Sequence, residues 1–204
     1  MFSEYGTDFN RPLWESSKWA SRDTIMVVSR LKDSENIMIV YSVWNTDSLY
    51  FFFRVSDSDL RAHISEKDHP RLFLDDMVEI LIDTQCRKDS CWDRDDIVYH
   101  VNLLGFKKDD RGTADCKTDP SWDGNAGIAV HLLGSLNDST DTDKGYLLSL
   151  AFDWNELNLK PVEGLKMGIN FANGDNDGIG RRLFDWSGAW PMRSPYAYGD
   201  LILK

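Results

Sequence analysis

The sequence predicts an all-β fold, an antiparallel, jelly-roll-like β-sandwich of about nine or more strands in one domain, residues 1–204. Short runs of residues typical of strands, many with alternating apolar and polar side chains, recur along the whole chain. Polar turns separate these runs, and helical periodicity is nearly absent. The chain has no linker, low-complexity run or obvious repeat, and its 204 residues can bury one substantial core.

The expected strands follow one another at short intervals. Residues 36–44 and 49–56 are joined by the polar turn NTDS and are predicted to pair as a hairpin. The other expected strands are residues 24–29, 76–83, 96–105, 126–134, 145–152, 165–172 and 199–204. The segment DWNELNL predicts one helical turn, with Asp153 as its N-cap and Glu156 closing a capping box.

The net charge of −11 makes nucleic acid and anionic membranes poor partners. Solubility alone explains this charge, although divalent cations or neutral polar ligands also suit it. No apolar run approaches the roughly 18 residues of a membrane span. The start, MFSEYGTDFN, lacks the basic and apolar regions of a signal peptide, so either the protein is intracellular or its signal is not part of this sequence.

The three cysteines do not form a structural zinc site, because no CxxC pair and no nearby histidine pair accompanies them. Cys86 and Cys91 flank the short loop CRKDSC and are candidates for a disulfide in an oxidising compartment, which leaves Cys116 over. Three free thiols are an equally good interpretation.

No stretch of the sequence indicates a catalytic centre. There is no nucleophile elbow and no recognisable triad context. The acidic pairs Asp75–Asp76, Asp95–Asp96 and Asp109–Asp110 resemble glycosidase carboxylates by number only, since neighbours on a strand point to opposite faces. A solvated acidic surface explains these pairs better.

Two loops carry oxygen donors that suit a hard cation. NGDNDG (173–178) has the spacing that opens an EF-hand, but Phe184 stands where the bidentate glutamate belongs. The segment is therefore predicted to be a glycine-rich turn. DSTDTDKG (138–145) is equally rich in oxygen donors, and calcium in one of these loops is compatible with the sequence.

Tryptophans near the chain start and before strands are predicted to fill the core, namely Trp14, Trp19, Trp122 and Trp154. The segment RRLFDWSGAWPMRSPYAYGD has the composition of a loop instead. Its rings suit stacking on the apolar face of a sugar, although some of them are expected to close the sandwich. These rings are Phe184, Trp186, Trp190, Tyr196 and Tyr198.

One carboxylate stands out in the strand within FLDDMVEILID. Alternation places Glu79 between Met77 and Leu81 on one face, while Val78 and Ile80 lie on the other. A carboxylate in this position is either exposed to solvent or held there for a purpose.

Several motifs in this order resemble the family 9 carbohydrate-binding modules and their relatives, which often accompany xylanases. The motifs are LWESSKWA, VWNTDSLYFFFRVSDSD, FLDDMVEILID, DDIVYHVNLLG, GYLLSLAFDWNEL, NDGIGRRLFDWSG and YAYGDLIL, and they span roughly residues 8–204. The resemblance implies a non-catalytic β-sandwich that holds the end of a sugar chain between two aromatic rings. Glucan-type or xylan-type mono-, oligo- or polysaccharides are the implied partners.

The resemblance also implies a ligand site made of Phe73, Glu79, His100, Asn102 and Trp186. Phe73 stands six positions before the glutamate, where the family has a tryptophan, and His100 fills a position that is often arginine. A phenyl ring is a smaller stacking surface, and a neutral histidine lacks the guanidinium fork. Both differences bear on which sugar is bound.

Family members commonly bind calcium near the loop before the glutamate strand. The matching oxygen donors here are Asp57, Asp59, Asp68 and Asp76, which implies a structural calcium ion. The resemblance further implies an extracellular, cell-surface or periplasmic location.

Three other functions stay open from the sequence. The first is a structural or interaction domain with a degenerate sugar site, which the substitutions at Phe73 and His100 favour. The second is a haem-binding relative of the same sandwich, with axial ligands from the methionines or from His63, His69, His100 or His131. The third is glycosidase activity within this chain.

Overall fold

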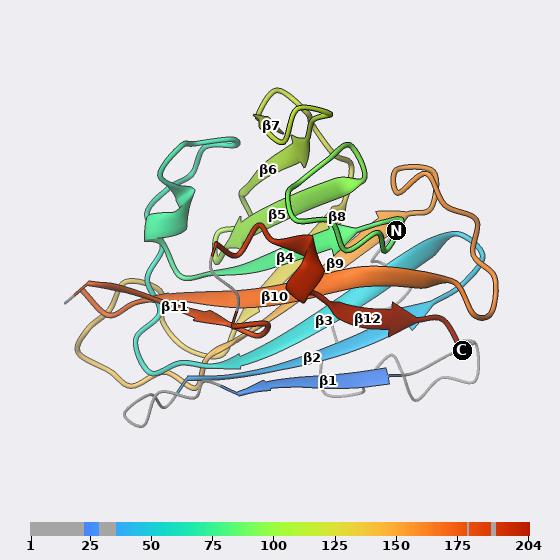
Figure 1. The fold of residues 1–204 in the computed structure, drawn as a ribbon. Helices are drawn as coiled ribbons and strands as arrows, with labels where there is room; N and C mark the ends of the chain where they lie inside the picture. Colours follow the sequence, from blue (N-terminus) through green and yellow to red (C-terminus); the bar gives the residue numbers. More distant parts are fainter. Residues whose placement is uncertain (1–22, 29–35, 179, 189–190) are drawn as a thin grey trace.

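The computed structural model of the chain describes residues 23–28, 36–178, 180–188 and 191–204. Two antiparallel sheets face each other and form a sandwich, which confirms the predicted fold class (Figure 1). The described ranges contain no α-helix, only two short 3-10 turns, η3 (Leu72–Leu74) and η4 (Pro195–Ala197). None of the helices in these ranges has the length and apolar character needed to cross a membrane.

The first sheet has the strand order β1-β2-β3-β9-β8. The chain turns back directly between β2 and β3, and Trp44 pairs with Leu49 at that end, as the predicted hairpin requires. The strands are β1 (Asp23–Val28), β2 (Ile37–Trp44), β3 (Ser48–Ser56), β8 (Gly127–Leu132) and β9 (Tyr146–Asp153).

The second sheet has the order β11-β10-β4-β5-β6-β7. Strand β10 also pairs with β12, so that β11 and β12 lie at opposite ends of the same edge of β10 (Figure 1). The strands are β4 (Met77–Asp83), β5 (Asp96–Asn102), β6 (Lys107–Gly112), β7 (Thr118–Asp119), β10 (Lys166–Asn176), β11 (Arg181–Asp185) and β12 (Gly199–Ile202).

All nine expected strands are present. Three further strands, β6, β7 and β11, were not expected. Strand β6 has the sequence KKDDRG, which shows no apolar alternation, yet it pairs with β5 along most of its length. Strand β10 continues to Asn176, so the glycine-rich turn expected at residues 173–178 begins only after that residue. Strand β11 starts the segment that was predicted to be a loop.

The segment after β9 forms the expected single turn with an α-helical hydrogen bond, which is too short to be a helix. The Leu157 N–H donates to the Asp153 carbonyl at 3.2 Å, and the Asp153 carboxylate accepts from the Asn155 N–H at 2.7 Å. Asp153 therefore caps the first turn, as expected. Glu156 does not close a capping box, because its carboxylate accepts the hydroxyl of Tyr99 in the core.

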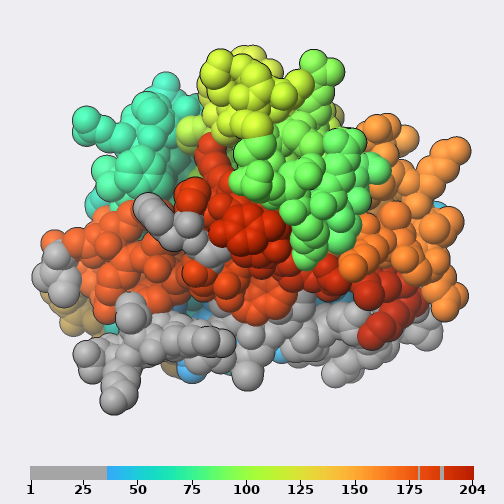
Figure 2. Space-filling view, in the orientation of Figure 1, coloured from blue at the N-terminus to red at the C-terminus, as the bar shows by residue number. Residues whose placement is uncertain are grey.

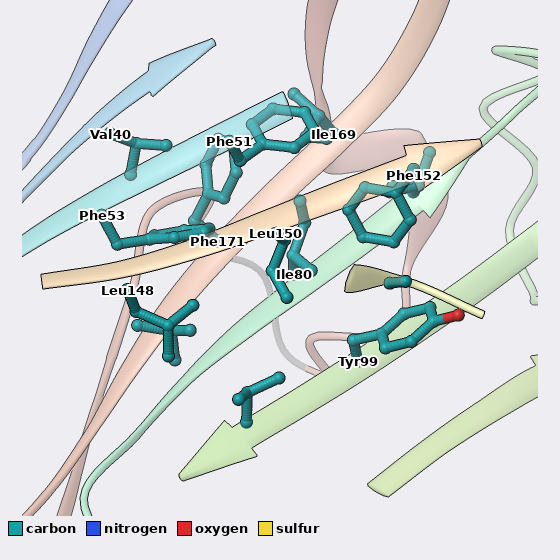
Figure 3. Close-up of a cluster of buried hydrophobic side chains, with 14 of the residues drawn as sticks. Val40, Phe51, Phe53, Ile80, Tyr99, Leu148, Leu150, Phe152, Ile169 and Phe171 are labelled. Atoms are coloured by element: carbon teal, nitrogen blue, oxygen red, sulfur yellow. The ribbon is translucent and has the colours of Figure 1, made fainter. Parts of the chain in front are cut away.

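The core lies between the two sheets. Phe51, Phe53, Phe152 and Phe171 meet there edge to face, with ring centroids 5.6–6.1 Å apart, and Tyr99 packs against Phe152 from the second sheet (Figure 3). Trp154 is buried in this core and Trp122 packs against it, as the sequence predicts. Such rings supply large buried areas and favourable edge-to-face contacts.

A second apolar cluster covers the outward face of the second sheet. Leu81 and Val98 lie on this face of β4 and β5, and Trp92, Met192 and Tyr198 pack on them. Trp92 comes from the loop after β4, and its indole N–H donates to the Tyr198 hydroxyl at 3.0 Å. Strand β4 is therefore buried on both faces, unlike a strand with one solvated face.

The disulfide joins Cys91 to Cys116, so both the candidate Cys86–Cys91 pairing and the interpretation as three free thiols are wrong. Cys86 is a free cysteine whose thiol lies 3.8 Å from the Asp200 carboxylate. Residues 87–95 instead reach across to the turn between β6 and β7, where Cys116 lies. Cys86 and Cys91 are close in sequence but lie beside different elements. Cys86 is near Asp200 of β12, whereas Cys91 is bonded to Cys116 in the β6–β7 turn.

Removing the Cys91–Cys116 disulfide should lower the free energy of unfolding by about 3 kcal/mol, because the cross-link restricts the unfolded chain. The double variant Cys91→Ala, Cys116→Ala is compared with the wild type by urea denaturation. Cys86→Ala is the matched control and should change stability little. Equal stability of the double variant and the wild type would contradict this pairing.

Candidate functional site

A row of side chains crosses the outward face of the second sheet through Glu79. The strand registers place Ala172 of β10, Glu79 of β4, His100 of β5 and Lys108 of β6 side by side. Asp185 of β11 extends the row beyond Ala172. Because paired residues in adjacent strands share a face, these polar groups gather on one side of the sheet.

Glu79 and His100 form the centre of this row. The His100 Nδ1 lies 3.4 Å from the Glu79 carboxylate, and the two side chains are 12% and 6% exposed. Burial by itself raises the pKa of Glu79, but the His100 ring and the charges of Arg193 and Arg181 outweigh it and hold the pKa below its ordinary value. Glu79 is thus an ionised carboxylate in a nearly dry position.

Arg193 reaches this centre from the C-terminal segment. Its guanidinium lies 2.9 Å from the Asp110 carboxylate and 4.7 Å from the centroid of the Trp92 ring. Lys108, next to His100, binds the same Asp110 at 2.8 Å. The two cations therefore share one carboxylate.

Phe73 lies outside the row, on η3 just before β4, where the Asn176 side chain donates to the carbonyl of the next residue, Leu74. Its ring is among the exposed large apolar groups, with 38% of the residue accessible. The Arg181 guanidinium lies over this ring, 5.1 Å from its centroid, which is the geometry of a cation–π contact. Figure 2 shows this side of the molecule, with the segment around η3 at the upper left, the β6–β7 hairpin at the top and the C-terminal segment below them.

Asn102 shares the face but is completely buried, and its amide is fully used within the protein. The side-chain nitrogen donates to the Ile64 carbonyl and the Asp75 carboxylate at 2.7 and 2.8 Å. The side-chain oxygen accepts from the N–H groups of Leu104 and Phe106. Asn102 therefore orders the surrounding loops, and the expectation that it reaches a ligand is not met in this arrangement.

Trp186 does not face Phe73. Asp185 is on the outward face, so the next residue turns to the core side, where the Trp186 N–H donates to the Phe171 carbonyl at 2.9 Å. The Trp186 ring lies 5.8 Å from the Phe171 ring and packs so closely on Gly199 that a Cβ there would meet it at 2.2 Å. The expected slot between two aromatic rings is therefore not formed by this pair.

The remaining C-terminal rings divide as expected between core and surface. Phe184 and Tyr198 are buried, whereas Tyr196 on η4 is exposed. Trp14, Trp19 and Trp190 lie outside the described residues.

A cluster of carboxylates lies at the far end of β10. Ligand atoms of Asp57, Asp175 and Asp177 all lie within 4.8 Å of one another. The Oδ2 of Asp57 is buried and has no hydrogen-bond partner among the described residues. Arg182 partly compensates the charge, since its guanidinium lies 2.8 Å from Asp175 and also contacts Asp177. These oxygens fit a hard cation such as calcium.

Burial and mutual repulsion raise the pKa values in this cluster. Burial, reinforced by the charges of Asp175 and Asp177, raises the pKa of Asp57 to about 7. Burial and the charge of Asp57 raise that of Asp76 to about 8, and burial and Asp177 raise that of Asp175 to about 6.

The four aspartates expected to hold calcium are not all together. Asp57 belongs to the cluster, and Asp76 borders it, where its carboxylate accepts from the N–H groups of Arg61 and Asn176. Asp59 is bound by the Arg61 guanidinium at 2.6 Å. Asp68 is not part of this cluster: its N–H donates to the Lys107 carbonyl on β6, and its carboxylate lies 3.7 Å from the Lys67 ammonium.

The chain matches the family model "Carbohydrate family 9 binding domain-like" over residues 10–204, which is nearly its whole length. The chain belongs to this family.

Two solved structures of a family 9 carbohydrate-binding module from Caldicellulosiruptor kristjanssonii share the fold of this family 9 domain. One is a complex with cellotriose, with a TM-score of 0.68 at 20% identity, covering 95% of this chain and 86% of the other. The second is a complex with glucose, with a TM-score of 0.67 at 21% identity, covering 95% and 87%. A search of curated proteins found no match.

Sequence reasoning missed the cations of this family 9 domain. Arg181 and Arg193 come from a segment that drew attention for its aromatic rings, and Lys108 from a strand without apolar alternation. Asp175 and Asp177 were noted as oxygen donors, but nothing in the sequence linked them to Asp57, about 120 residues earlier.

Replacing Asn102 by Ala should lower the free energy of unfolding by about 2–4 kcal/mol, because the buried Asp75 carboxylate and three backbone groups lose a partner. Urea denaturation measures the change. Asn125→Ala, at an exposed position, is the control and should cost less than about 0.5 kcal/mol. A small loss for Asn102→Ala would contradict a structural role.

Proposed function

We propose that this domain binds the saccharide of a glucan-type or xylan-type chain without catalysing a reaction. The observation that carries the proposal is Glu79, a nearly buried carboxylate kept ionised by His100 and two arginines. A buried charge is costly unless it is paired, so a buried carboxylate between Met77 and Leu81 suits a recognition group.

The side chains around Glu79 match the chemistry of a sugar. An ionised carboxylate accepts strong hydrogen bonds from hydroxyl groups, and the ring nitrogens of His100 can donate or accept them. The exposed Phe73 ring offers an apolar surface for the C–H face of a pyranose. A few placed polar groups beside an apolar surface are typical of small-molecule sites.

The solved structures in complex with cellotriose and glucose support a saccharide ligand for this domain as well. The electrostatics argue against glycoside hydrolysis at this site. Hydrolysis needs a pair of carboxyl groups, one of them a general acid with a raised pKa. The pKa of Glu79 is lowered, and Asp185 on the same row is hydrogen-bonded by Asn170 and Ser187.

The Cys91–Cys116 disulfide supports an extracellular, cell-surface or periplasmic location, because such bonds persist in oxidising compartments. The likeness to modules that accompany xylanases further suggests that the domain serves polysaccharide breakdown by holding substrate near a catalytic domain.

We also propose that Asp57, Asp175 and Asp177 hold a structural calcium ion. Support comes from their mutual distances and from the unpaired Asp57 oxygen. Bound calcium would replace protons on these carboxyls and neutralise their repulsion.

A structural or interaction domain with a degenerate sugar site is the second candidate. The packing of Trp186 against Phe171 and the complete burial of Asn102 favour it, since both residues are withdrawn from the face that carries Glu79. The haem alternative has less support. His100 lies against Glu79, and His63 and His131 are exposed, so none of these three occupies an apolar pocket.

Glu79→Gln should weaken binding of cellotriose or xylotriose about tenfold, because a neutral amide accepts weaker hydrogen bonds than a carboxylate. Titration calorimetry at pH 7 measures the affinity, and thermal unfolding verifies that the variant is folded.

Glu66→Gln, at an exposed position, is the matched control and should bind like the wild type. Unchanged binding by Glu79→Gln would overturn the proposed site. Failure of the folded wild type to bind any neutral or acidic saccharide would leave the degenerate-site interpretation.

Calcium should raise the melting temperature more at pH 8 than at pH 5.5. The raised pKa values mean that the folded protein holds protons that the unfolded chain releases near 3.8, so without calcium stability falls as the pH rises toward about 8. Calcium binds the deprotonated carboxylates, and at about 100 times its Kd it should add roughly 5–10 °C.

Melting curves in EDTA and in calcium chloride at both pH values test this expectation. Asp57→Asn should remove most of the calcium effect, whereas the control Asp141→Asn, at an exposed position, should keep it. An identical calcium effect in both variants, or no effect in the wild type, would rule out the proposed cation site.

A further inference from the structure

Three cationic side chains surround the Glu79 row, although the whole chain carries a net charge of −11. Lys108 and Arg193 lie on one side, and Arg181 lies on the other, over Phe73. The carboxylates of Glu79, Asp110 and Asp185 lie among these cations. Positive side chains therefore gather at this row, although the chain as a whole is acidic.

The two sides differ in how their charges are compensated. Lys108 and Arg193 both bind Asp110, at 2.8 and 2.9 Å. Arg181 forms no ion pair with a carboxylate in the described part of the chain, and its contact is the face of the Phe73 ring. The neighbouring Arg182, in contrast, forms ion pairs with Asp175 and Asp177.

Arg181 is exposed at the start of β11, so a ligand can reach its guanidinium. Neighbouring atoms lower the pKa of Arg181 by partial desolvation, and the charge of Glu79 acts against this shift. An accessible guanidinium without a carboxylate partner has hydrogen-bond donors and charge to offer to a ligand.

We propose that the saccharide of this site carries a carboxylate, as in a hexuronic acid, and that Arg181 binds this group beside the Phe73 ring. The proposal rests on the saccharide-binding function proposed above and adds the class of sugar. The Phe73 ring supports one face of the pyranose, Glu79 and His100 bind its hydroxyl groups, and the acid group lies on the Arg181 side.

The chemistry of the guanidinium favours a carboxylate over a neutral hydroxymethyl group. A planar fork of N–H donors matches the two oxygens of a carboxylate and forms charge-assisted bonds with it. Glu79 is also negative, but it lies on β4 and does not contact Arg181 directly. It is therefore available for the hydroxyl groups of the sugar. Binding to Arg181 thereby keeps the carboxylate of the sugar away from the carboxylate of Glu79.

The test compares D-glucuronate with D-glucose, which differ only at C6, by titration calorimetry at pH 7 and low salt. Glucuronate should bind the wild type about tenfold or more tightly than glucose, and added salt should reduce this ratio. Arg181→Gln should abolish the preference, and Arg181→Lys should keep part of it, since it retains the charge but not the fork.

Arg54→Gln is the matched control, because it removes the same charge from an exposed position of β3 in the other sheet, and it should keep the full preference. Melting temperatures verify that each variant is folded. Equal affinity for the two sugars, or an equal preference in Arg181→Gln and wild type, would overturn the inference and leave saccharide binding standing. No binding of either sugar by the folded wild type would overturn this inference, and it would overturn saccharide binding as well only if cellotriose and xylotriose also fail to bind.

Discussion

The burial of strand β4 on both faces is the constraint on which the rest of this structure depends. Its core face carries Val78, Ile80 and Ile82, which need no polar partner. Its outward face carries Glu79 and Asp83, which are withdrawn from water and cannot stay charged there without partners. The loop after β4 and the C-terminal segment cover this face, and the C-terminal segment also supplies Arg193, part of the charge that Glu79 requires.

The side chains that compensate the negative charge of Glu79 come from distant parts of the chain. His100 is brought by the register of β5, Arg181 by β11 and Arg193 by the segment that follows it. Trp92 supports Arg193 from the loop after β4, and the Cys91–Cys116 disulfide ties that loop to the β6–β7 turn. The site is consequently a product of the covering segments as much as of the sheet.

The carboxylate cluster and the Glu79 row are connected by strand β10 and by hydrogen bonds to the segment around η3. Asp175 and Ala172 belong to the same strand, and Asp76 accepts the Asn176 N–H at 2.7 Å just before β4 begins. The Asn176 side chain in turn donates to the Leu74 carbonyl, next to Phe73. A cation that orders the cluster would thereby help to fix the position of the Phe73 ring relative to Glu79.

Alternation along single strands is a local property, and the sequence determined it well. It placed Glu79, Met77 and Leu81 on one face and predicted the sandwich, because each expected strand carries its own pattern of buried residues. It did not reveal β6, whose charged residues Asp109 and Asp110 are buried through pairing with lysines and not through apolar character.

Only the tertiary structure decided which residues meet. Trp186 directly follows Asp185, so its side chain points to the opposite face of the sheet. A ring expected on the ligand face therefore packs against Phe171 on the core side. Asp57 meets Asp175, and Cys91 meets Cys116, across separations that no local pattern encodes. Sequence fixes the preference of each segment for a strand and a face, whereas long-range contacts arise from the register and packing of whole sheets.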